Sequence, residues 1–530
     1  MKRRNTPSEE VARNEMGGIN AYTVLTCAVA SAGALLFGLD VGITGGVTSD
    51  PNFLRIFFPA IAEQMDANTS ENAYCSFNSQ TLSLFTSSFF LAGMVSSVPA
   101  SWLSATRGRK SSMAVGASLY VLGSALNAGA RRTPMLLVGR IVLGLGCGFV
   151  NQSVPTFLSE ISPPEHRGVL QTFFQIFVNL GILIAGIVNY YVLPLDYGFR
   201  ISLGVFIPPA LVLLGGCTLL PETPAFLCSA DRDEDALNAL RKLRGKDADV
   251  QEEYEAIRKG TDELKSHGTT QQQLRLILSR PYRGELVVAV FVALFSQLTG
   301  INSMLYYAPE LFSILSSNEN ISLISAVVTA SVFLAGALTS LTVIDRKGRR
   351  KLLLAGGSAM FVLQVVTAVL LAVEFDPFGV KAAPSWFPPV LLAVISLFVY
   401  CFGWSWGPLG WLVPVESQSQ RTRSAAATMS VLSNFFAVFL TTQLFLPMLC
   451  KLEWGTFLFF AGFDVVMTVF VKYLVVETKG VDMDEMHEQY AAHPFWRRYA
   501  QHSSPEHGCG AEGVEEPLLP AHELSEDEPG

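Results

Sequence analysis

Polar side chains that could do chemistry stand inside otherwise apolar stretches of this sequence. Asp40 is the lone carboxylate of LLFGLDVGITGG, and FSQLTGIN places Ser296, Gln297, Thr299 and Asn302 within about two helical turns. Unpaired polar groups in hydrocarbon cost several kcal/mol each, so these groups must face a partner helix or a bound polar ligand. A carboxylate in such a place can bind and release a proton. Side-chain amides can both donate to and accept from ligand hydroxyl groups.

The composition indicates that the elements holding these residues are membrane spans. Half of the 530 residues are hydrophobic, 15% are charged and the mean hydropathy is +0.37, whereas about a quarter of a soluble domain is charged. Much of the net charge of −8 lies in the tail after Gly480. We therefore expect membrane lipid around the chain and no nucleic-acid partner.

Twelve apolar stretches are long enough to cross about 30 Å of hydrocarbon as helices at 1.5 Å per residue. Strands of a membrane barrel would be about ten residues long and would alternate in polarity. The sequence therefore predicts an all-α membrane protein with twelve transmembrane helices. These cover residues 20–44, 82–104, 112–130, 134–158, 168–193, 198–220, 284–314, 321–344, 352–373, 387–413, 424–448 and 455–475.

Lys and Arg collect on one side of the predicted spans, as they do in cytoplasmic loops. They gather at residues 2–4, 107–110 and 346–351 and in the long loop 221–283. Both termini are therefore expected in the cytoplasm. The first span is expected to be an uncleaved signal anchor, because no small-residue cleavage site follows a short apolar core.

The chain carries an internal repeat. RGRK at 107–110 is echoed by DRKGRRK at 345–351, and PETP at 221–224 by VETKG at 476–480. Two pseudo-symmetric six-helix halves that rock about a midplane site would explain such pairs. The expected parts are a cytoplasmic N-terminal segment (1–19), one half (20–220) with an external lid loop (49–80), a cytoplasmic helical loop (221–283), the other half (284–476) and a largely disordered cytoplasmic tail (477–530).

Motifs spread over residues 20 to 485 carry a family resemblance. QLTGIN, GPLGWLVP, PETP and the terminal ETKG together resemble the sugar porters of the major facilitator superfamily. GLDVGITGGVTSDPNFLRIFFP, NQSVPTFLSEISPPEHRG and PMLC look like the plant and green-algal monosaccharide/proton symporters. The resemblance implies a major facilitator fold and proton-coupled symport of a monosaccharide, a hexose such as glucose, into the cell by alternating access.

The resemblance also implies a sugar site, in which amides bind hydroxyl groups and an aromatic ring faces the apolar side of the sugar. The positions that match sugar contacts are Gln175, Gln297, Asn302 and Trp411, and those that match the wall are Phe37, Val41 and Ile182. Ser296 stands where the family usually has a second glutamine, and Phe333 where it usually has an asparagine. With these two amides absent, hexose, pentose and polyol substrates all stay open.

Two charged constellations follow from the same resemblance. Asp40 in the first span and Arg140 in the fourth match the proton-coupling pair of the plant symporters, with a purely structural ion pair as the alternative. A cytoplasmic latch would join arginines after spans two and eight to acidic residues at the ends of other helices, with orientation by positive charge as a second role. The matching positions are Arg109, Glu160 and Glu222 in the first half and Arg349, Glu416, Arg423 and Glu477 in the second.

The external side carries further candidate sites. Cys75 and Cys450 fall there, where an oxidising compartment permits pairing, and they match the bridge between the lid and the C-terminal half in the plant symporters. Asn68 and Asn320 head sequons on the same side and are candidates for glycosylation.

Enzyme motifs such as GxSxG, HExxH and GK[ST] do not occur, so we expect a secondary active transporter rather than an enzyme. The proton is the expected coupling ion, with no metal or other cofactor. A facilitative sugar uniporter would not depend on Asp40, and a sugar sensor would bind without flux; both stay as alternatives. We expect a functional monomer in the plasma membrane, with the vacuolar or another internal membrane as the alternative.

Overall fold

The protein is described here by a computed structural model. It describes residues 20–66, 73–75, 77–163, 167–245, 248–266, 275–307, 319–375, 384–419, 422–479, 481 and 486–500. Every regular element in these ranges is a helix. Eleven helices of the described part are long and apolar enough to cross a membrane. The remaining expected span is helical too: α6 (Arg109–Ala128) lies along α7, and its serines and glycines make it less apolar.

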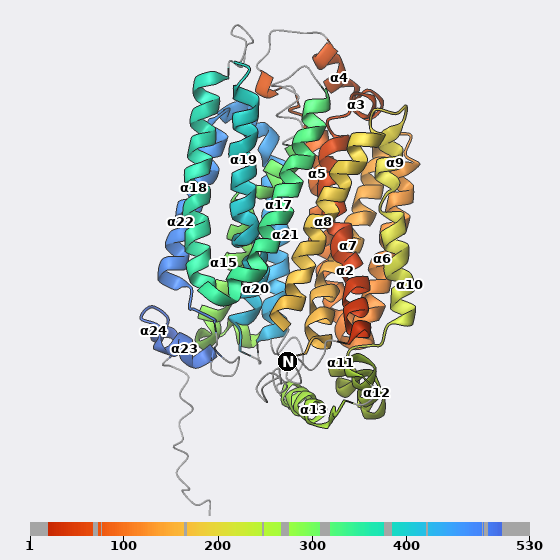
Figure 1. Ribbon diagram of the computed structural model, residues 1–530, viewed down its shortest axis with the longest axis vertical. Helices are drawn as coiled ribbons and strands as arrows, with labels where there is room; N and C mark the ends of the chain where they lie inside the picture. Colours follow the sequence, from red (N-terminus) through yellow and green to blue (C-terminus); the bar gives the residue numbers. More distant parts are fainter. Residues whose placement is uncertain are drawn as a thin grey trace, which may run out of the picture.

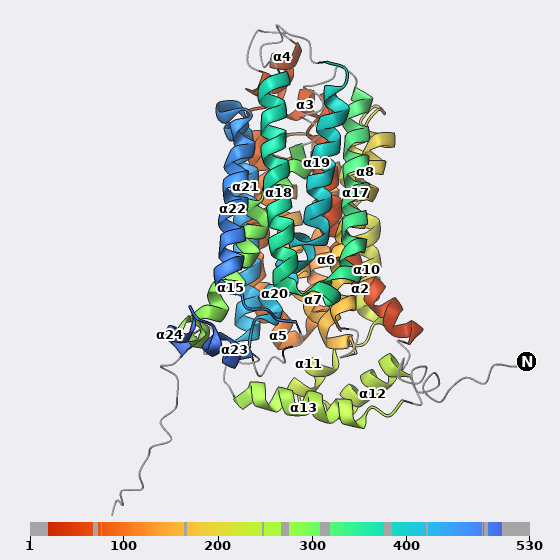
Figure 2. The same ribbon diagram turned by 60° about the vertical axis from the view of Figure 1, so that its left-hand side comes forward.

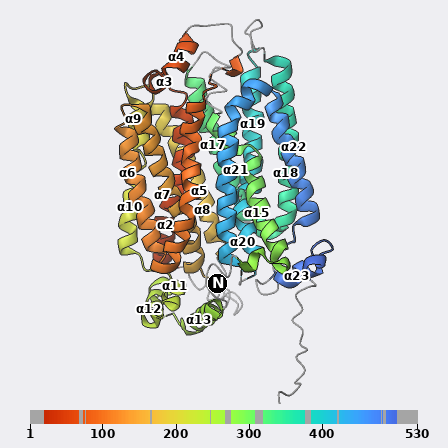
Figure 3. The same cartoon turned by 180° about the vertical axis from the view of Figure 1, so that it is seen from behind.

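The helices of the first half of the chain form one group (Figures 1 and 3). Besides α6, this group contains α2 (Ala21–Val47), α5 (Gln80–Arg107), α7 (Thr133–Ile161), α8 (Arg167–Val192), α9 (Gly198–Gly204) and α10 (Ile207–Leu219).

The helices of the second half form a group beside the first, with α5 next to α21 where the two groups meet (Figure 3). The group contains η3 (Arg280–Tyr282), α15 (Arg283–Leu298), α17 (Glu319–Lys347), α18 (Arg349–Glu374), α19 (Phe387–Trp404), α20 (Trp406–Glu416), α21 (Arg423–Leu452) and α22 (Gly455–Leu474).

The same glycine turn joins consecutive helices in each half. Gly108 between α5 and α6 has φ +95°, and Gly348 between α17 and α18 has φ +86°. Glycine adopts this backbone conformation without steric cost. A Cβ would lie 2.3 Å from a carboxylate oxygen of Glu222 at the first turn and 2.8 Å from one of Glu477 at the second. The repeat seen in the sequence is thus a repeat of local structure.

The seventh span is not one continuous helix. α15 stops at Leu298, Gly300 has φ +78°, and a second helical segment follows at residues 301–307. The predicted span over 284–314 coincides, in the described residues, with the membrane-spanning segment Arg280–Tyr307, and its backbone turns at Gly300. The break separates Gln297 from Asn302 and aims the second segment at the other half.

Short helices cover the end of the bundle that we call the lid end (Figure 2). They are α3 (Pro51–Phe57), α4 (Pro59–Asp66) and η1 (Ala73–Cys75). Asp50 caps α3 by accepting from the backbone N–H groups of Asn52 and Phe53. The buried Phe53 ring packs against the rings of Phe85 and Phe199, which anchors this cover to the first half.

At the opposite end, below α2, α6 and α10, lie α11 (Pro224–Ser229), α12 (Asp233–Arg244) and α13 (Gln251–Ser266) (Figures 1 and 2). We call this the α11–α13 end. Arg244 on α12 ties the helices together, because it pairs with Glu253 at 2.6 Å and donates to the carbonyl of Ile161 at 3.0 Å. The described part of the segment between the two halves is thus helical.

Part of the expected tail is helical. Residues 486–500 contain α23 (Met486–Ala492) and α24 (Arg497–Ala500). The buried rings of Tyr490 and Trp496 pack where Gly284 leaves room at the start of α15. This apolar contact orders the segment; residues 501–530 lie outside the described part.

Candidate functional site

Asp40 and Arg140 meet in the interior of the first half. Both side chains are fully buried, and Arg140 forms an ion pair with Asp40 through Nη1, with Nη2 3.4 Å from the second carboxylate oxygen. The packing of α2 against α7 brings the two residues together although they are separated by 100 positions. An ion pair of this kind needs further hydrogen bonds to offset the desolvation of both charges.

The surroundings of Arg140 supply part of that compensation. Its Nε donates to the carbonyl of Phe85 at 3.1 Å. Its guanidinium carbon lies 4.9 Å from the ring centre of Phe85 and 5.0 Å from that of Phe89. Desolvated cation–π contacts add to the stability of the charge. The guanidinium of Arg140 is therefore held by residues of α5 as well as by Asp40.

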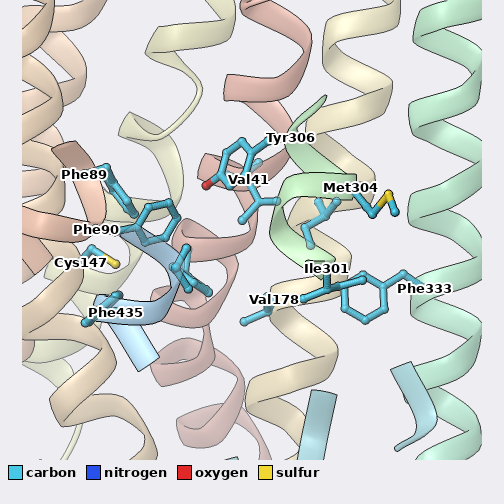
Figure 4. Packing of buried hydrophobic residues seen from close by; sticks show 14 of the residues in the cluster. Val41, Phe89, Phe90, Cys147, Val178, Ile301, Met304, Tyr306, Phe333 and Phe435 are labelled. Carbon is cyan, nitrogen blue, oxygen red and sulfur yellow. The ribbon is translucent and has the colours of Figure 1, made fainter. Parts of the chain in front are cut away.

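Tyr306 connects this pair to the other half. Its hydroxyl donates to Asp40 Oδ2 at 3.1 Å, and it comes from the segment 301–307 behind the helix break. Figure 4 shows Tyr306 beside Val41, with Phe89 and Phe90 close by. The carboxylate of Asp40 thus makes one contact within its own half, with Arg140, and one contact between the halves, with Tyr306.

A cavity of about 310 Å³ lies between the two halves toward the α11–α13 end. This volume is at the lower limit of the range of about 300–1,000 Å³ seen for small-molecule sites. Gln175 and Trp411 line the cavity, one from each half. Trp411 offers an aromatic face and packs edge-on against Phe174 with ring centres 6.0 Å apart.

The cavity walls carry hydrogen-bond acceptors without partners. Asn151 Oδ1, Gln152 Oε1 and Glu160 Oε2 are buried and have no hydrogen-bond partner among the described residues. Prolines at 155 and 414 lie inside α7 and α20 and also line the cavity. A proline leaves the carbonyl four residues earlier without its helical partner. Three residues that line the cavity thus carry a buried oxygen atom without a hydrogen-bond partner among the described residues.

The polar residues of the seventh span lie behind this cavity rather than in its lining. Asn302 Nδ2 donates to Gln297 Oε1 at 2.5 Å across the helix break. Ser296 donates to the carbonyl of Ala293 at 2.8 Å and packs against Gly410, which does line the cavity. The two predicted amides of this span satisfy each other in this state.

The other predicted contact positions are packed in the interior. Phe37, Val41 and Ile182 are buried and do not line the cavity. Phe333, which stands in place of an amide, packs against the ring of Phe402 with centres 5.9 Å apart. Figure 4 places it beside Val178 and Ile301. The aromatic ring fills apolar space that an amide would have made polar.

The charged residues of the first half meet at the α11–α13 end. Arg109 Nη2 lies 2.6 Å from Glu160 Oε1. Glu222 instead accepts from the backbone N–H groups of Arg109 and Lys110 at 3.2 and 3.3 Å, so it caps α6. Burial raises the pKa of Glu222, and backbone hydrogen bonds from Thr223 and Lys110 partly offset this rise.

The second half repeats the arrangement. Arg349 makes two hydrogen bonds to the carboxylate of Glu416, at 3.0 and 3.1 Å. Glu477 accepts from the backbone N–H groups of Arg349 and Arg350 at 2.8 and 3.2 Å. Each of these networks joins helix ends within its own half. Arg423 begins α21, and its side chain lies outside the described part.

The lid end carries the disulfide bond, which joins Cys75 to Cys450 of α21. Asn68 lies outside the described residues, and Asn320 falls in the first turn of α17 with a side chain that is not described. In the part of the chain that the structure covers, no group of three or more His, Cys, Asp or Glu side chains could hold a metal ion.

Some residues of the site escaped prediction. Tyr306 stands in the run SMLYYAPELF at 303–312, and a tyrosine in so apolar a run gives no signal of its hydrogen-bond partner. Asn151 and Gln152 stand in the motif NQSVP, and their polarity inside a span is the signal that could have found them. Asn179 also accepts from Gln175 Nε2 at 3.0 Å.

Two repeated groups of membrane helices with a cavity between them define a secondary transporter. A family model described as sugar (and other) transporter matches residues 26–490. The chain belongs to this family, and it is a multi-pass membrane protein.

Relatives cover nearly the whole chain. Sugar transport protein 1 of Arabidopsis thaliana is 42% identical over 488 residues, which are 92% of this chain and 93% of that protein. H(+)/hexose cotransporter 2 of Parachlorella kessleri is 43% identical over 91% of this chain and 89% of its own length.

Solved structures share the fold. The proton:xylose symporter XylE of the major facilitator superfamily, bound to 6-bromo-6-deoxy-D-glucose, superimposes with a TM-score of 0.73 at 23% identity. The match covers 89% of this chain and 99% of that one. The expected major facilitator fold is thereby confirmed.

Proposed function

We propose that this chain is a proton-coupled symporter that carries a monosaccharide, a hexose such as glucose, across its membrane by alternating access. The observation that carries the proposal is the buried Asp40–Arg140 pair with Tyr306 of the opposite half bound to the same carboxylate. The name of the H(+)/hexose cotransporter among the relatives supports the substrate class and the coupling ion.

Asp40 would couple the two halves through its charge. As a carboxylate it holds Arg140 on α7 and accepts from Tyr306 in the segment 301–307. A proton on Asp40 removes the ion pair and weakens the bond to Tyr306, because a neutral acceptor binds less strongly than a charged one. The segment 301–307 is then free to move against α2.

The sugar would occupy the cavity between Gln175 and Trp411. The unpaired oxygens of Asn151, Gln152 and Glu160 would accept its hydroxyl groups, and Trp411 would face its apolar side. Gln297 and Asn302 would exchange their mutual bond for bonds to the sugar as the halves close. Ser296 and Phe333 offer fewer hydrogen bonds than amides, which favours a substrate with fewer recognised hydroxyl groups.

The lid end would face outward and the α11–α13 end the cytoplasm, with both termini on the cytoplasmic side. Lys and Arg gather at the α11–α13 end, as the positive-inside rule requires. The disulfide bond at the lid end fits an oxidising exterior. The plasma membrane is the proposed location, the monomer is the proposed unit, and the proton is the only coupling species needed.

The test is uptake of radiolabelled glucose and xylose into proteoliposomes with an acidic exterior. We expect accumulation above equilibrium for the unmodified chain and loss of that accumulation in Asp40→Asn. Asp464→Asn is the matched control, because Asp464 is also a buried carboxylate of a membrane helix but lies outside this site. It should accumulate sugar as the unmodified chain does.

Three other outcomes would reject the proposal. Accumulation by Asp40→Asn equal to that of the unmodified chain would remove Asp40 from proton coupling. Equilibration without accumulation by the unmodified chain would indicate a uniporter. Sugar binding without any flux would indicate a sensor.

A further inference from the structure

A second, larger cavity lies at the α11–α13 end, outside the transport site. Its volume is about 1210 Å³, and its walls come from the ends of α2, α5, α6 and α10 and from α11 and α12. Figures 1 and 3 show α11 and α12 directly below the helix ends of the first half. Neither Asp40 nor any residue of the sugar cavity lines it.

The lining of this cavity is strongly basic. Five of its side chains are positively charged and two, Glu222 and Asp235, are acidic; the positive ones are Arg107, Lys110, Arg232, Arg241 and Lys242. This excess contrasts with the net charge of −8 of the whole chain. It is a local feature, because α12 and the turn between α5 and α6 bring basic residues from distant parts of the sequence to one place.

Most of this positive charge is not neutralised. Asp235 pairs with Arg232 at 2.7 Å, and Glu222 is occupied by the backbone N–H groups that begin α6. Lys110 binds the carbonyl oxygen of Leu220. Among the described residues, the exposed Arg107, Arg241 and Lys242 have no acidic partner.

The cavity lies at the boundary between the apolar bundle and the aqueous end. Tyr22 in the first turn of α2 and Cys217 and Thr218 in the last turn of α10 belong to its wall. Leu219, the next residue, is 82% exposed on the outer surface. Headgroups of a bilayer around this bundle would lie at the same level, and clustered Lys and Arg attract anionic headgroups at such a boundary.

We propose that this cavity binds a phosphate-bearing anion, with an anionic phospholipid headgroup as its occupant and Arg107, Arg241 and Lys242 as its principal ligands. Guanidinium groups bind phosphate through paired hydrogen bonds. The phosphate would bridge α12 to the turn between α5 and α6. The bound lipid would thereby tie the helical loop to the first half.

The test measures binding of three soluble probes to the detergent-purified full chain. The probes are dioctanoyl phosphatidylinositol bisphosphate, dioctanoyl phosphatidylcholine and inositol trisphosphate. We expect the bisphosphate lipid to bind and the double variant Arg241→Gln/Lys242→Gln to weaken this binding about tenfold. Arg497→Gln/Arg498→Gln is the matched control, because it removes two exposed positive charges from α24 outside the cavity; we expect its affinity to stay within about twofold.

The probes separate the two sources of the same chemistry. Much tighter binding of the lipid than of inositol trisphosphate assigns the site to a membrane phospholipid, and equal binding assigns it to a soluble polyphosphate. Three results would overturn the proposal. They are equal weakening of lipid binding by the two double variants, binding of phosphatidylcholine as tight as that of the bisphosphate lipid, and no binding of either the bisphosphate lipid or inositol trisphosphate. Cooperative unfolding without ligand shows that the double variant Arg241→Gln/Lys242→Gln is folded. If it is not, Arg107→Gln takes its place in the binding test.

Discussion

Asp40 of α2 and Asp464 of α22 both lie fully buried in membrane helices, and their surroundings differ. Asp40 is paired with Arg140 and accepts from Tyr306, whereas neither oxygen of Asp464 on α22 has a hydrogen-bond partner among the described residues. A buried polar group without a partner costs about 1–3 kcal/mol. Removing one member of a buried ion pair costs about 3–5 kcal/mol, because the other charge is left alone.

We therefore predict opposite effects of the same substitution at the two positions. Asp464→Leu should raise the free energy of unfolding by about 1–3 kcal/mol, and Asp40→Leu should lower it by about 3–5 kcal/mol. Thermal unfolding of both variants in the same detergent measures the two shifts. A lower midpoint for Asp464→Leu would show that its carboxylate has a structural partner.

Gln152 belongs to the cavity by position and by its unpaired oxygen. Gln152→Leu removes one hydrogen bond to a sugar hydroxyl, which is worth about 1 kcal/mol, and should raise the apparent KM about fivefold. Uptake kinetics in proteoliposomes provide the measurement. Gln251→Leu on the exposed surface of α13 is the control, and an equal rise in KM for both variants would remove Gln152 from the site.

At this scale the sequence identified residue types better than residue contacts. An acid inside an apolar stretch marked Asp40 as a candidate, and the structure places Arg140 against it; Asp464 stands in a similar stretch, so the type of residue alone does not identify the site. Hydrogen-bond partners of amides depend on tertiary geometry, so the bond between Gln297 and Asn302 was not predictable. For the same reason the packing of Phe333 against Phe402 could not be derived from its position alone.

Gly300 is the element-scale feature with the clearest consequence. Its φ of +78° is strained for any L side chain, and a Cβ there would lie 2.9 Å from the ring of Phe460. The residue thus permits both the turn and the close approach of α22. The direction of the segment 301–307, and with it the contact of Tyr306 to Asp40, depends on this glycine.

Gly300→Ala should lower the free energy of unfolding by about 2–4 kcal/mol, the sum of backbone strain and overpacking, and should reduce transport. Gly462→Ala on α22 is the control, because a Cβ there meets nothing within 4 Å. The measurement compares the unfolding midpoints and uptake rates of the two variants, and we expect both to fall only in Gly300→Ala. Wild-type behaviour of Gly300→Ala would show that the helix break tolerates a side chain.

Helix existence was predictable because each span is a long apolar run, and all twelve expected spans contain helix in the described residues. The break in the seventh span was not predictable from the sequence, because threonine and glycine, the residue types at 299 and 300, are also common within membrane helices. The helices within residues 486–500 have no such apolar run in the sequence. The segment has only two large buried rings, Tyr490 and Trp496. Their burial depends on a contact with Gly284, which is distant in the sequence.

At the scale of the whole molecule, the disulfide bond connects the lid to the second half across 375 positions of sequence. Because it restricts the unfolded chain, its loss should cost about 2–4 kcal/mol. We predict that Cys75→Ser lowers the unfolding midpoint and that reductant lowers the midpoint of the unmodified chain equally. Reductant should not change the variant further, since the free cysteines of the described part are buried; a further shift would point to another site of action.

The two halves make different contacts at their two ends. Near the middle and the lid end they touch through Tyr306 on Asp40 and through Ser87, which donates to Gln443 at 2.5 Å. Toward the α11–α13 end they enclose the cavity of Gln175 and Trp411. The two halves are therefore in contact at the lid end and leave a cavity between them toward the α11–α13 end.

The most direct measurement of proton-coupled symport is proton movement driven by sugar alone. Proteoliposomes with a pH-sensitive dye inside and no initial pH difference would receive an inward glucose gradient. Symport predicts acidification of the interior by the unmodified chain and by Asp464→Asn, and none by Asp40→Asn. Glucose entry without any change of internal pH in the unmodified chain would contradict proton coupling.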